Sequence, residues 1–241
     1  MAVGALKWDQ ENERLYETGV QKGVLFVYDS ENKKYGAGEA WNGLTAVTES
    51  PSGAEPTKLY ANDSVYLTLM SAEELGLTIE AYMYPDGFAK CNGEAQVIKG
   101  MNLGQQARSK FGLCYRTAVG NDTLGNDYSY KLHFVYGCLA SPSEKAYNTV
   151  NDDPEVDPMS WEVSTTPVPV TIEIDGEKKE FKPTASITIN AADFKDEAKA
   201  ANLKALEDAI YGTASAESYL PSPEGIYSLL NTGTDSTIEA E

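Results

Sequence analysis

Apolar and polar residues alternate over much of the chain, which is the pattern of β-strands with one buried face. The strand predicted at residues 77–84 ends at the turn-forming residues 85–87 and places four side chains on its apolar face: Leu77, Ile79, Ala81 and Met83. Other strands are predicted at residues 23–28, 35–47, 111–119, 128–139, 159–168, 171–174, 180–182 and 186–189. The chain is therefore expected to be β-dominated.

Turn-forming residues between strands predict two hairpins. Residues 111–119 and 128–139 are separated by residues 120–127, which are rich in Gly, Asn and Asp. The second of these strands has one face that is expected to lie in the core or in an interface: Tyr128, Tyr130, Leu132, Phe134, Tyr136 and Cys138. Asp175-Gly176 is a strong hairpin signal between the two short strands that flank it.

One segment, residues 192–211, has the periodicity of an α-helix. Asn190 is the predicted N-cap and Gly212 the predicted stop. The helix has one apolar stripe: Ala198, Ala201, Ala205, Leu206, Ala209 and Ile210. Lys199 falls within this stripe, so the amphipathic pattern is imperfect.

Segments without periodicity are predicted to be loops or arms. Residues 48–64 contain many helix and strand breakers and are predicted to form a long loop. The chain is then organised as an N-terminal arm (1–22), a main β domain (23–212) and a C-terminal arm (213–241). The C-terminal arm is rich in Ser, Thr, Pro and Gly, and is expected to be mobile until a partner orders it.

Composition fits one principal domain with a sizeable core. The chain has 241 residues, of which 41% are hydrophobic and 10% are aromatic, including 15 Tyr. So many aromatic residues suit half-buried sheet surfaces and interfaces better than a helical bundle.

The net charge disfavours tight binding to nucleic acid. Lys and Arg number 19 against 37 Asp and Glu, which gives −18 at pH 7 and a field that repels phosphates. Acidity on its own also serves solubility, so it gains a specific meaning only if DNA lies nearby.

Neither a membrane segment nor a disulfide framework is predicted. No run approaches about 18 apolar residues, and residues 1–8 lack the order of a signal peptide, so the protein is expected to stay where it is made. Cys91, Cys114 and Cys138 have no C-x-x-C spacing, and each is expected to be a reduced, apolar strand residue.

Candidate chemistry is sparse. The single histidine, His133, is expected to be a satisfied polar residue on a sheet face, and no phosphate-cradling glycine loop occurs. The acidic segments 122–127 and 152–157 lack EF-hand spacing and are expected to be solvated turns. Nothing selects a carboxylate pair for hydrolysis among 37 acids. No catalytic, cofactor-binding or metal-binding residue is predicted, and we expect a structural or binding protein that is not an enzyme.

Six segments, taken in order, carry a resemblance to a known family: residues 16–20 (YETGV), 40–44 (AWNGL), 82–88 (YMYPDGF), 111–116 (FGLCYR), 130–133 (YKLH) and 161–168 (WEVSTTPV). Together they resemble the major tail proteins, or tail tube proteins, of long-tailed bacteriophages and prophages of Gram-positive bacteria. The resemblance extends from about Trp8 to the end of the predicted helix. Its specificity comes from order and extent, because these motifs are structural.

The resemblance implies a β-sandwich or open barrel flanked by one main helix. In that family six copies form a ring in which an inward sheet from each copy closes into one shared barrel, and stacked rings form the tube for DNA ejection. It implies no cofactor and no membrane contact. The implied partners are other copies of the chain, the tape measure protein, the tail terminator and baseplate or tail-tip proteins, while genomic DNA passes without specific binding. The protein would be assembled in the host bacterial cytoplasm and would reside in the virion. The length of the chain mildly favours a non-contractile tail.

Two groups of site residues follow from this resemblance. The long loop and the N-terminal arm would bridge stacked rings through four anchors: Trp8, Tyr16, Leu59 and Tyr60. The candidates for an acidic lumen are Glu80 and Glu162. The alternative is a β-sandwich module that decorates a capsid or binds glycans, and a hydrolase on a β-scaffold is a third class.

Overall fold

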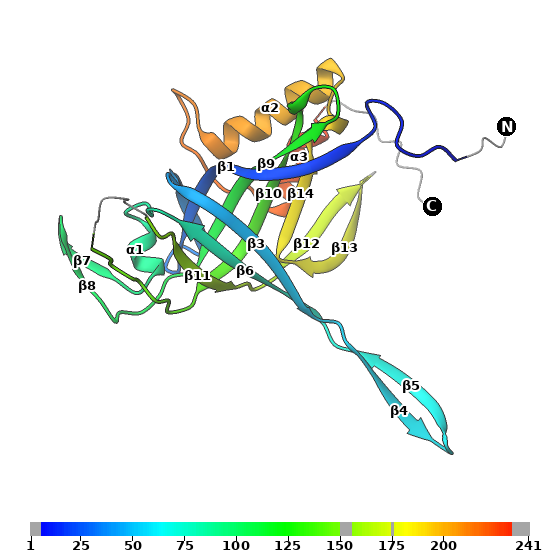
Figure 1. Ribbon diagram of the computed structural model, residues 1–241, viewed down its shortest axis with the longest axis horizontal. Coiled ribbons are helices and arrows are strands. Elements are labelled where there is room, and N and C mark those ends of the chain that lie inside the picture. Colours follow the sequence, from blue (N-terminus) through cyan, green and yellow to red (C-terminus); the bar gives the residue numbers. More distant parts are fainter. Residues whose placement is uncertain (1–5, 150–155, 175, 233–241) are drawn as a thin grey trace.

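The computed structural model describes residues 6–149, 156–174 and 176–232, and they form three layers. The two longer helices cover one face of a central sheet, and a second group of strands packs against its other face (Figure 1). The prediction of a β-dominated fold is confirmed, and the described residues form no closed barrel.

The two strand layers belong to one antiparallel, eight-stranded sheet that folds over. The central layer contains β2 (Lys34–Ala40), β1 (Leu15–Asp29), β9 (Phe111–Asn121), β10 (Gly125–Ala140) and β14 (Ser186–Asn190). The outer layer contains β11 (Met159–Ser164), β6 (Glu73–Ala81) and β3 (Leu44–Gly53), in that order. The predicted hairpin of 111–119 and 128–139 is present as β9 and β10.

Strand β10 passes from one layer to the other at Gly137. The β9–β10 register shifts between Val135 and Cys138, and the last two residues of β10 then pair with β11. Gly137 has φ +61°, and a Cβ atom there would lie 2.3 Å from the Thr166 carbonyl oxygen. A glycine is needed because this bend combines a left-handed backbone with a close backbone approach.

The bend also changes which core each side chain enters. Leu132, Phe134 and Tyr136 lie in the core beneath the helices, as the alternation predicts. Cys138 lies instead in the core between the two strand layers, so the prediction that it shares their face is wrong. The extra residue at the bulge shifts the side-chain alternation by one position.

The core between the strand layers is rich in aromatic residues. Trp161 lies at its centre, with Phe88 at 5.2 Å and Trp41 at 6.1 Å between ring centroids. Trp161 donates its indole N–H to the Asn92 side-chain oxygen at 3.1 Å, which satisfies the buried nitrogen. Phe88 comes from the short helix α1 (Phe88–Cys91), which was not predicted.

On β6, the predicted alternation is correct up to the end of the strand. Leu77, Ile79 and Ala81 are buried. Met83 is exposed, because β6 ends at Ala81 and the chain turns away.

The prediction of a long loop at residues 48–64 is wrong. Strand β3 continues to Gly53, and β4 (Pro56–Ala61) pairs with β5 (Ser64–Met70) in a hairpin that projects far from the body (Figure 1). Residues with a left-handed backbone lie at two places where the strands are interrupted. Gly53 and Ala54 have positive φ where the ribbon breaks between β3 and β4, and Asn62 and Asp63 have positive φ in the tight turn at the tip.

The helical layer differs from prediction at both ends. Asn190 caps a 3₁₀ turn, η1 (Ala191–Asp193), and helix α2 begins only at Glu197 and ends at Tyr211 before Gly212. A second helix, α3 (Pro223–Leu230), lies within the predicted C-terminal arm, where Ser222 caps it and Ile226 is buried. This helix, which is part of the predicted arm, is thus packed against the body. Residues 233–241 lie outside the described residues. At the other end, β1 includes residues 15–22 of the predicted N-terminal arm.

Two small hairpins complete the structure. The Asp175-Gly176 signal is confirmed by the pairing of β12 (Val168–Ile174) with β13 (Glu177–Thr184). The strand predicted at 159–168 is divided, because β11 ends at Ser164 before β12 begins. The pair β7 (Ala95–Ile98) and β8 (Met101–Leu103) was not predicted.

Candidate assembly surfaces

The outer surface of the β3–β6–β11 layer is polar and acidic. Because β6 buries Leu77, Ile79 and Ala81, the intervening residues face outward. Cross-strand pairing adds the matching residues of β3 and β11, and we call the resulting surface the acidic face: Thr48, Ser50, Ser52, Glu74, Gly76, Thr78, Glu80, Ser160, Glu162 and Ser164.

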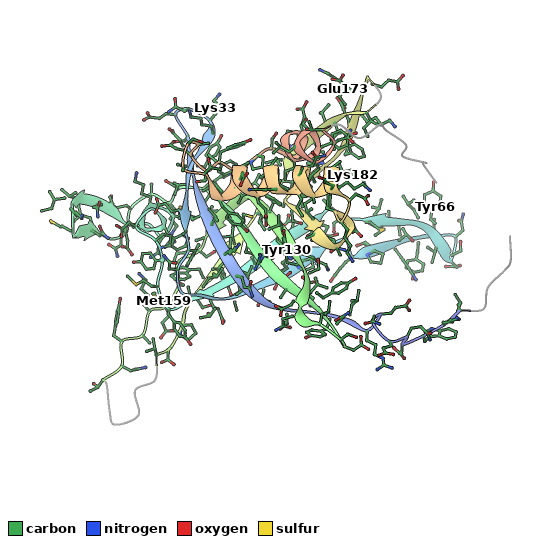
Figure 2. All side chains as sticks on the ribbon, turned by 90° about the horizontal axis from the view of Figure 1, so that it is seen from above. Lys33, Tyr66, Tyr130, Met159, Glu173 and Lys182 are labelled. Atoms are coloured by element: carbon green, nitrogen blue, oxygen red, sulfur yellow. The ribbon has the colours of Figure 1, made fainter. Side chains whose placement is uncertain are left out.

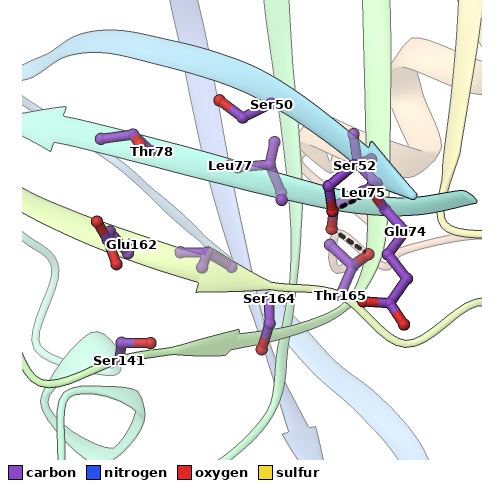
Figure 3. Close-up of a pocket in the computed structure, with 12 residues that line it drawn as sticks. Ser50, Ser52, Glu74, Leu75, Leu77, Thr78, Ser141, Glu162, Ser164 and Thr165 are labelled. Atoms are coloured by element: carbon purple, nitrogen blue, oxygen red, sulfur yellow. Dashed lines mark hydrogen bonds between the residues drawn. The ribbon is translucent and has the colours of Figure 1, made fainter. Parts of the chain in front are cut away.

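The two lumen candidates lie on this one face. Glu80 pairs with Ser160, and Glu162 pairs with Thr78, so the two carboxylates belong to neighbouring rows of the same surface. Figure 3 shows Glu162 and Thr78 on adjacent strands, and Glu74 further along β6. Glu74 was not predicted as a site residue, although its alternation with Leu75 and Leu77 was a usable signal.

Strands β3, β6 and β11 contain Glu residues but no Lys, Arg or His. A shallow hollow of about 350 Å³ lies on the acidic face beside Ser50 and Glu162. Among the described residues that line it, none is aromatic. Small hydroxyl groups and carboxylates are thus the groups that this surface presents.

Both margins of the outer layer have strand edges without a partner in the described chain. Strand β3 is the last strand of the sheet and pairs only with β6. Strand β11 pairs with β10 through Val163 and Ser164, and the Glu162 carbonyl accepts a hydrogen bond from the Ser141 amide, which leaves Met159–Trp161 open on that side. Pro51 removes one donor from the β3 edge. Open edges of this length favour pairing with another chain.

The β4–β5 hairpin, which we call the projecting hairpin (residues 56–70), is exposed along its whole length except for Ala61. Figure 2 shows Tyr66 far from the body of the molecule. Its large exposed side chains are Leu59, Tyr60, Val65, Tyr66, Leu67, Leu69 and Met70. An isolated two-stranded hairpin is at best marginally stable in water, so this surface is suited to burial against another chain.

The four predicted ring-stacking anchors have different environments. Leu59 and Tyr60 lie together on the projecting hairpin, and Trp8 is 73% exposed. Tyr16 contacts its own chain: a Cβ on Gly120 would lie 2.3 Å from the tyrosine ring, and the Tyr16 hydroxyl donates to Asn126 at 2.9 Å. The structure brings Leu59 and Tyr60 together, but neither Trp8 nor Tyr16 lies on that hairpin.

The predicted role of His133 as a satisfied polar residue is confirmed. Its Nε2 atom lies 2.9 Å from the Thr117 hydroxyl, and Thr117 donates its own proton to Glu17 at 2.6 Å. His133 must therefore donate to Thr117, which places a proton on Nε2. Burial lowers the pKa of His133, although the nearby carboxylates of Glu17 and Glu49 oppose this shift.

The cysteines are free and buried, as predicted, but the prediction that each is a strand residue is wrong for Cys91, which lies in helix α1. Burial raises the pKa of Cys91 to about 12, and those of Cys114 and Cys138 higher still, so none is a thiolate at neutral pH. In the part of the chain that the structure describes, no group of three or more His, Cys, Asp or Glu side chains is arranged to hold a metal ion. No helix within the described ranges is both long enough and apolar enough to cross a membrane.

No family model matches the chain, and no curated protein matches it.

Proposed function

We propose that the protein is a major tail protein of a long-tailed bacteriophage, which assembles into stacked hexameric rings and forms the tube for DNA ejection. The observation that carries the proposal is the acidic face, a polar strand surface that holds Glu74, Glu80 and Glu162 and is bounded by open edges. The resemblance carried by six segments within residues 16–168 supports the same proposal.

Open edges on both margins of one layer suit closure with other copies. If β3 of one copy pairs with β11 of the next, a ring of copies joins these layers into a single closed barrel. Closure satisfies the backbone groups of both edges and removes the risk of open-ended aggregation. The acidic face would then line the bore.

An acidic bore suits the passage of DNA. Carboxylates repel phosphates at contact range and avoid the counterion release that holds DNA on basic surfaces. Salt screens this repulsion within about 8 Å at physiological ionic strength, so the wall keeps DNA from adhering without blocking its passage.

The projecting hairpin supports the second level of assembly, the stacking of rings. It extends beyond the sheet and presents Leu59 and Tyr60 to solvent. Trp8, with its large exposed ring, is a second stacking anchor, while Tyr16 contributes mainly by fixing β1 against β9. Aromatic and aliphatic anchors of this kind contribute most when a partner buries them.

Electron microscopy and mass measurement of the purified chain test this proposal. We expect six-fold rings or tubes in negative stain, and a hexamer or its multiples by native mass spectrometry. A strictly monomeric species at all concentrations, together with its absence from any tail particle, would contradict the assignment.

The alternative of a capsid-decorating or glycan-binding module makes the opposite prediction for assembly. Sugar sites commonly offer an aromatic platform, and the lining of the hollow on the acidic face offers none among its described residues. Such a module would remain a monomer or small oligomer in the same experiment.

A further inference from the structure

The projecting hairpin has one face that is apolar and uncharged. Leu59 pairs with Leu67, and Thr57 pairs with Leu69, so these four side chains lie on the same side of the ribbon. The three leucines are between 43% and 49% exposed. We call this surface the apolar ridge.

A groove of matching character lies on the opposite side of the molecule. It is an open depression of about 380 Å³ between α3, α2, β12 and β14, and its walls include Ile172, Ile189, Phe194, Ile226 and Leu230. Lys199 is the one charged side chain among the described residues that line it. We call it the helix-side groove.

The ridge cannot reach the groove of its own chain. The β3–β6 ladder is paired as far as Gly53 and Glu73 and carries the hairpin away from the body (Figure 1). The groove is built on the helical side of the central layer, whereas β3 and β6 lie on its other side. A contact between the two surfaces therefore requires two molecules.

We propose that the apolar ridge of one copy packs into the helix-side groove of a second copy. This inference rests on the proposed function and names the acceptor surface for the stacking hairpin. Burial would remove three leucine side chains from water and would also cover the exposed parts of Ile172 and Leu230.

Charge fits the same arrangement. The two-residue turn at the hairpin tip ends in Asp63, and the groove carries the Lys199 ammonium. The ion pair of Lys199 with Asp196 is 3.5 Å long and well exposed, so it holds the ammonium only weakly. The carboxylate of an incoming hairpin tip can therefore pair with Lys199.

The contact is heterologous, because it joins two different surfaces of the same chain. Each copy donates one ridge and accepts one ridge, so the contact repeats from copy to copy without closing on itself as a twofold dimer would. Repetition of this kind produces linear growth, which is the behaviour required of stacked layers.

Two full-length variants separate the two halves of the contact. Leu67→Asp disables the ridge at an exposed position and keeps the groove, and Ile172→Asp disables the groove and keeps the ridge. We expect each variant alone to lose stacking, with at least about tenfold weaker self-association in sedimentation velocity. An equimolar mixture should form paired assemblies that do not grow further.

The outcomes distinguish this inference from the proposed function. If the wild-type chain forms tubes, but Ile172→Asp forms equally long tubes and the variants do not bind each other, the inference is overturned and the tube function stands. If the wild type forms no ring or tube and the variants still bind one to one, the contact stands and the tube function fails. Circular dichroism confirms that each variant is folded.

Charge reversal gives a second test that leaves the apolar side chains of the groove unchanged. Asp63→Lys and Lys199→Asp should each weaken the association about threefold, and the double variant should restore it. Both side chains are at the surface, so the fold is retained even if Ile172→Asp is unstable. Independent effects of the two substitutions, with no restoration, would overturn the pairing.

Discussion

Tyr115 and His133 stack face to face from strands β9 and β10, with ring centroids 4.6 Å apart and an interplanar angle of 4°. The Tyr115 hydroxyl donates to Glu49 of β3 at 2.7 Å, so the stacked pair links the central layer to the outer layer. The Tyr115–His133 pair therefore connects the helix-covered layer to β3, one of the three strands that form the acidic face.

Acidification should weaken this link through His133. Burial lowers the pKa of His133 below 6.5, so the unfolded chain binds a proton more readily than the folded chain. Stability should therefore fall as pH decreases below about 6.5. Glu17 acts at lower pH: its hydrogen bonds with Lys131 and Thr117 outweigh burial and lower its pKa below 4.5, so its contribution is lost as pH falls further.

Urea unfolding between pH 4 and pH 8 measures this dependence. His133→Gln keeps a side-chain donor for Thr117 but cannot titrate, so it should remove the part of the pH dependence just below about 6.5 and retain the part below about 4.5. An unchanged slope in the upper range would show that His133 does not control it.

The sequence predicted the elements that depend on local alternation. Leu77, Ile79 and Ala81 are buried where period-two patterning places them. The prediction failed where pairing between distant segments determines the structure. Most of residues 48–64 form strands because β3 pairs with β6 across the hairpin, although breakers are frequent there. The core that Cys138 enters depends on the bulge at Gly137, where the backbone approaches Thr166 closely.

The same distinction applies to the candidate surfaces. Glu80 and Glu162 lie on strands, as expected, but only the register of β6 with β11 shows that they share a face, and their place in a lumen stays a prediction. The helix-side groove was invisible in the sequence, because α3 looked like part of a mobile arm and its partner strands β12 and β14 are distant in the chain.

Gly137→Ala should be strongly destabilising. The new Cβ would meet the Thr166 carbonyl oxygen at 2.3 Å in a backbone with φ +61°, and strain of this kind costs about 1–3 kcal/mol. Urea denaturation of the variant measures the loss. Gly100→Ala is the matched control, since Gly100 has φ +89° but no heavy atom within 4 Å of the added Cβ. Equal losses in both variants would show that the close approach to Thr166 contributes nothing.

Tyr136→Phe should loosen the segment that carries α3. The buried Tyr136 hydroxyl donates to the Pro221 carbonyl at 2.9 Å, just before the helix begins. Its removal leaves that acceptor unsatisfied at a cost of about 1–3 kcal/mol. We expect a lower free energy of unfolding and faster amide exchange in α3. Tyr60→Phe, at an exposed position on the projecting hairpin, should change neither in the unassembled chain.

Charge reversal on the acidic face tests its role as a bore. Glu80→Lys and Glu162→Lys together replace two carboxylates with ammonium groups on that face in every copy. If this surface lines the tube, the variant tubes should retain short duplex DNA that wild-type tubes release, because a cationic wall gains affinity by releasing counterions. Retention should fall steeply as salt is raised from about 50 mM to 200 mM.

The control must change net charge equally while leaving that face intact. Glu173→Lys with Glu177→Lys meets this condition, because both residues belong to the β12–β13 hairpin and lie outside the acidic face. Binding is measured by co-sedimentation of labelled DNA with tubes of matched length. DNA retention by both variants alike would reduce the acidity to a property of the whole surface. Retention by neither would show that Glu80 and Glu162 face away from the DNA path. A wall that loses two carboxylates and gains two ammonium groups in every copy must attract a polyanion in contact with it.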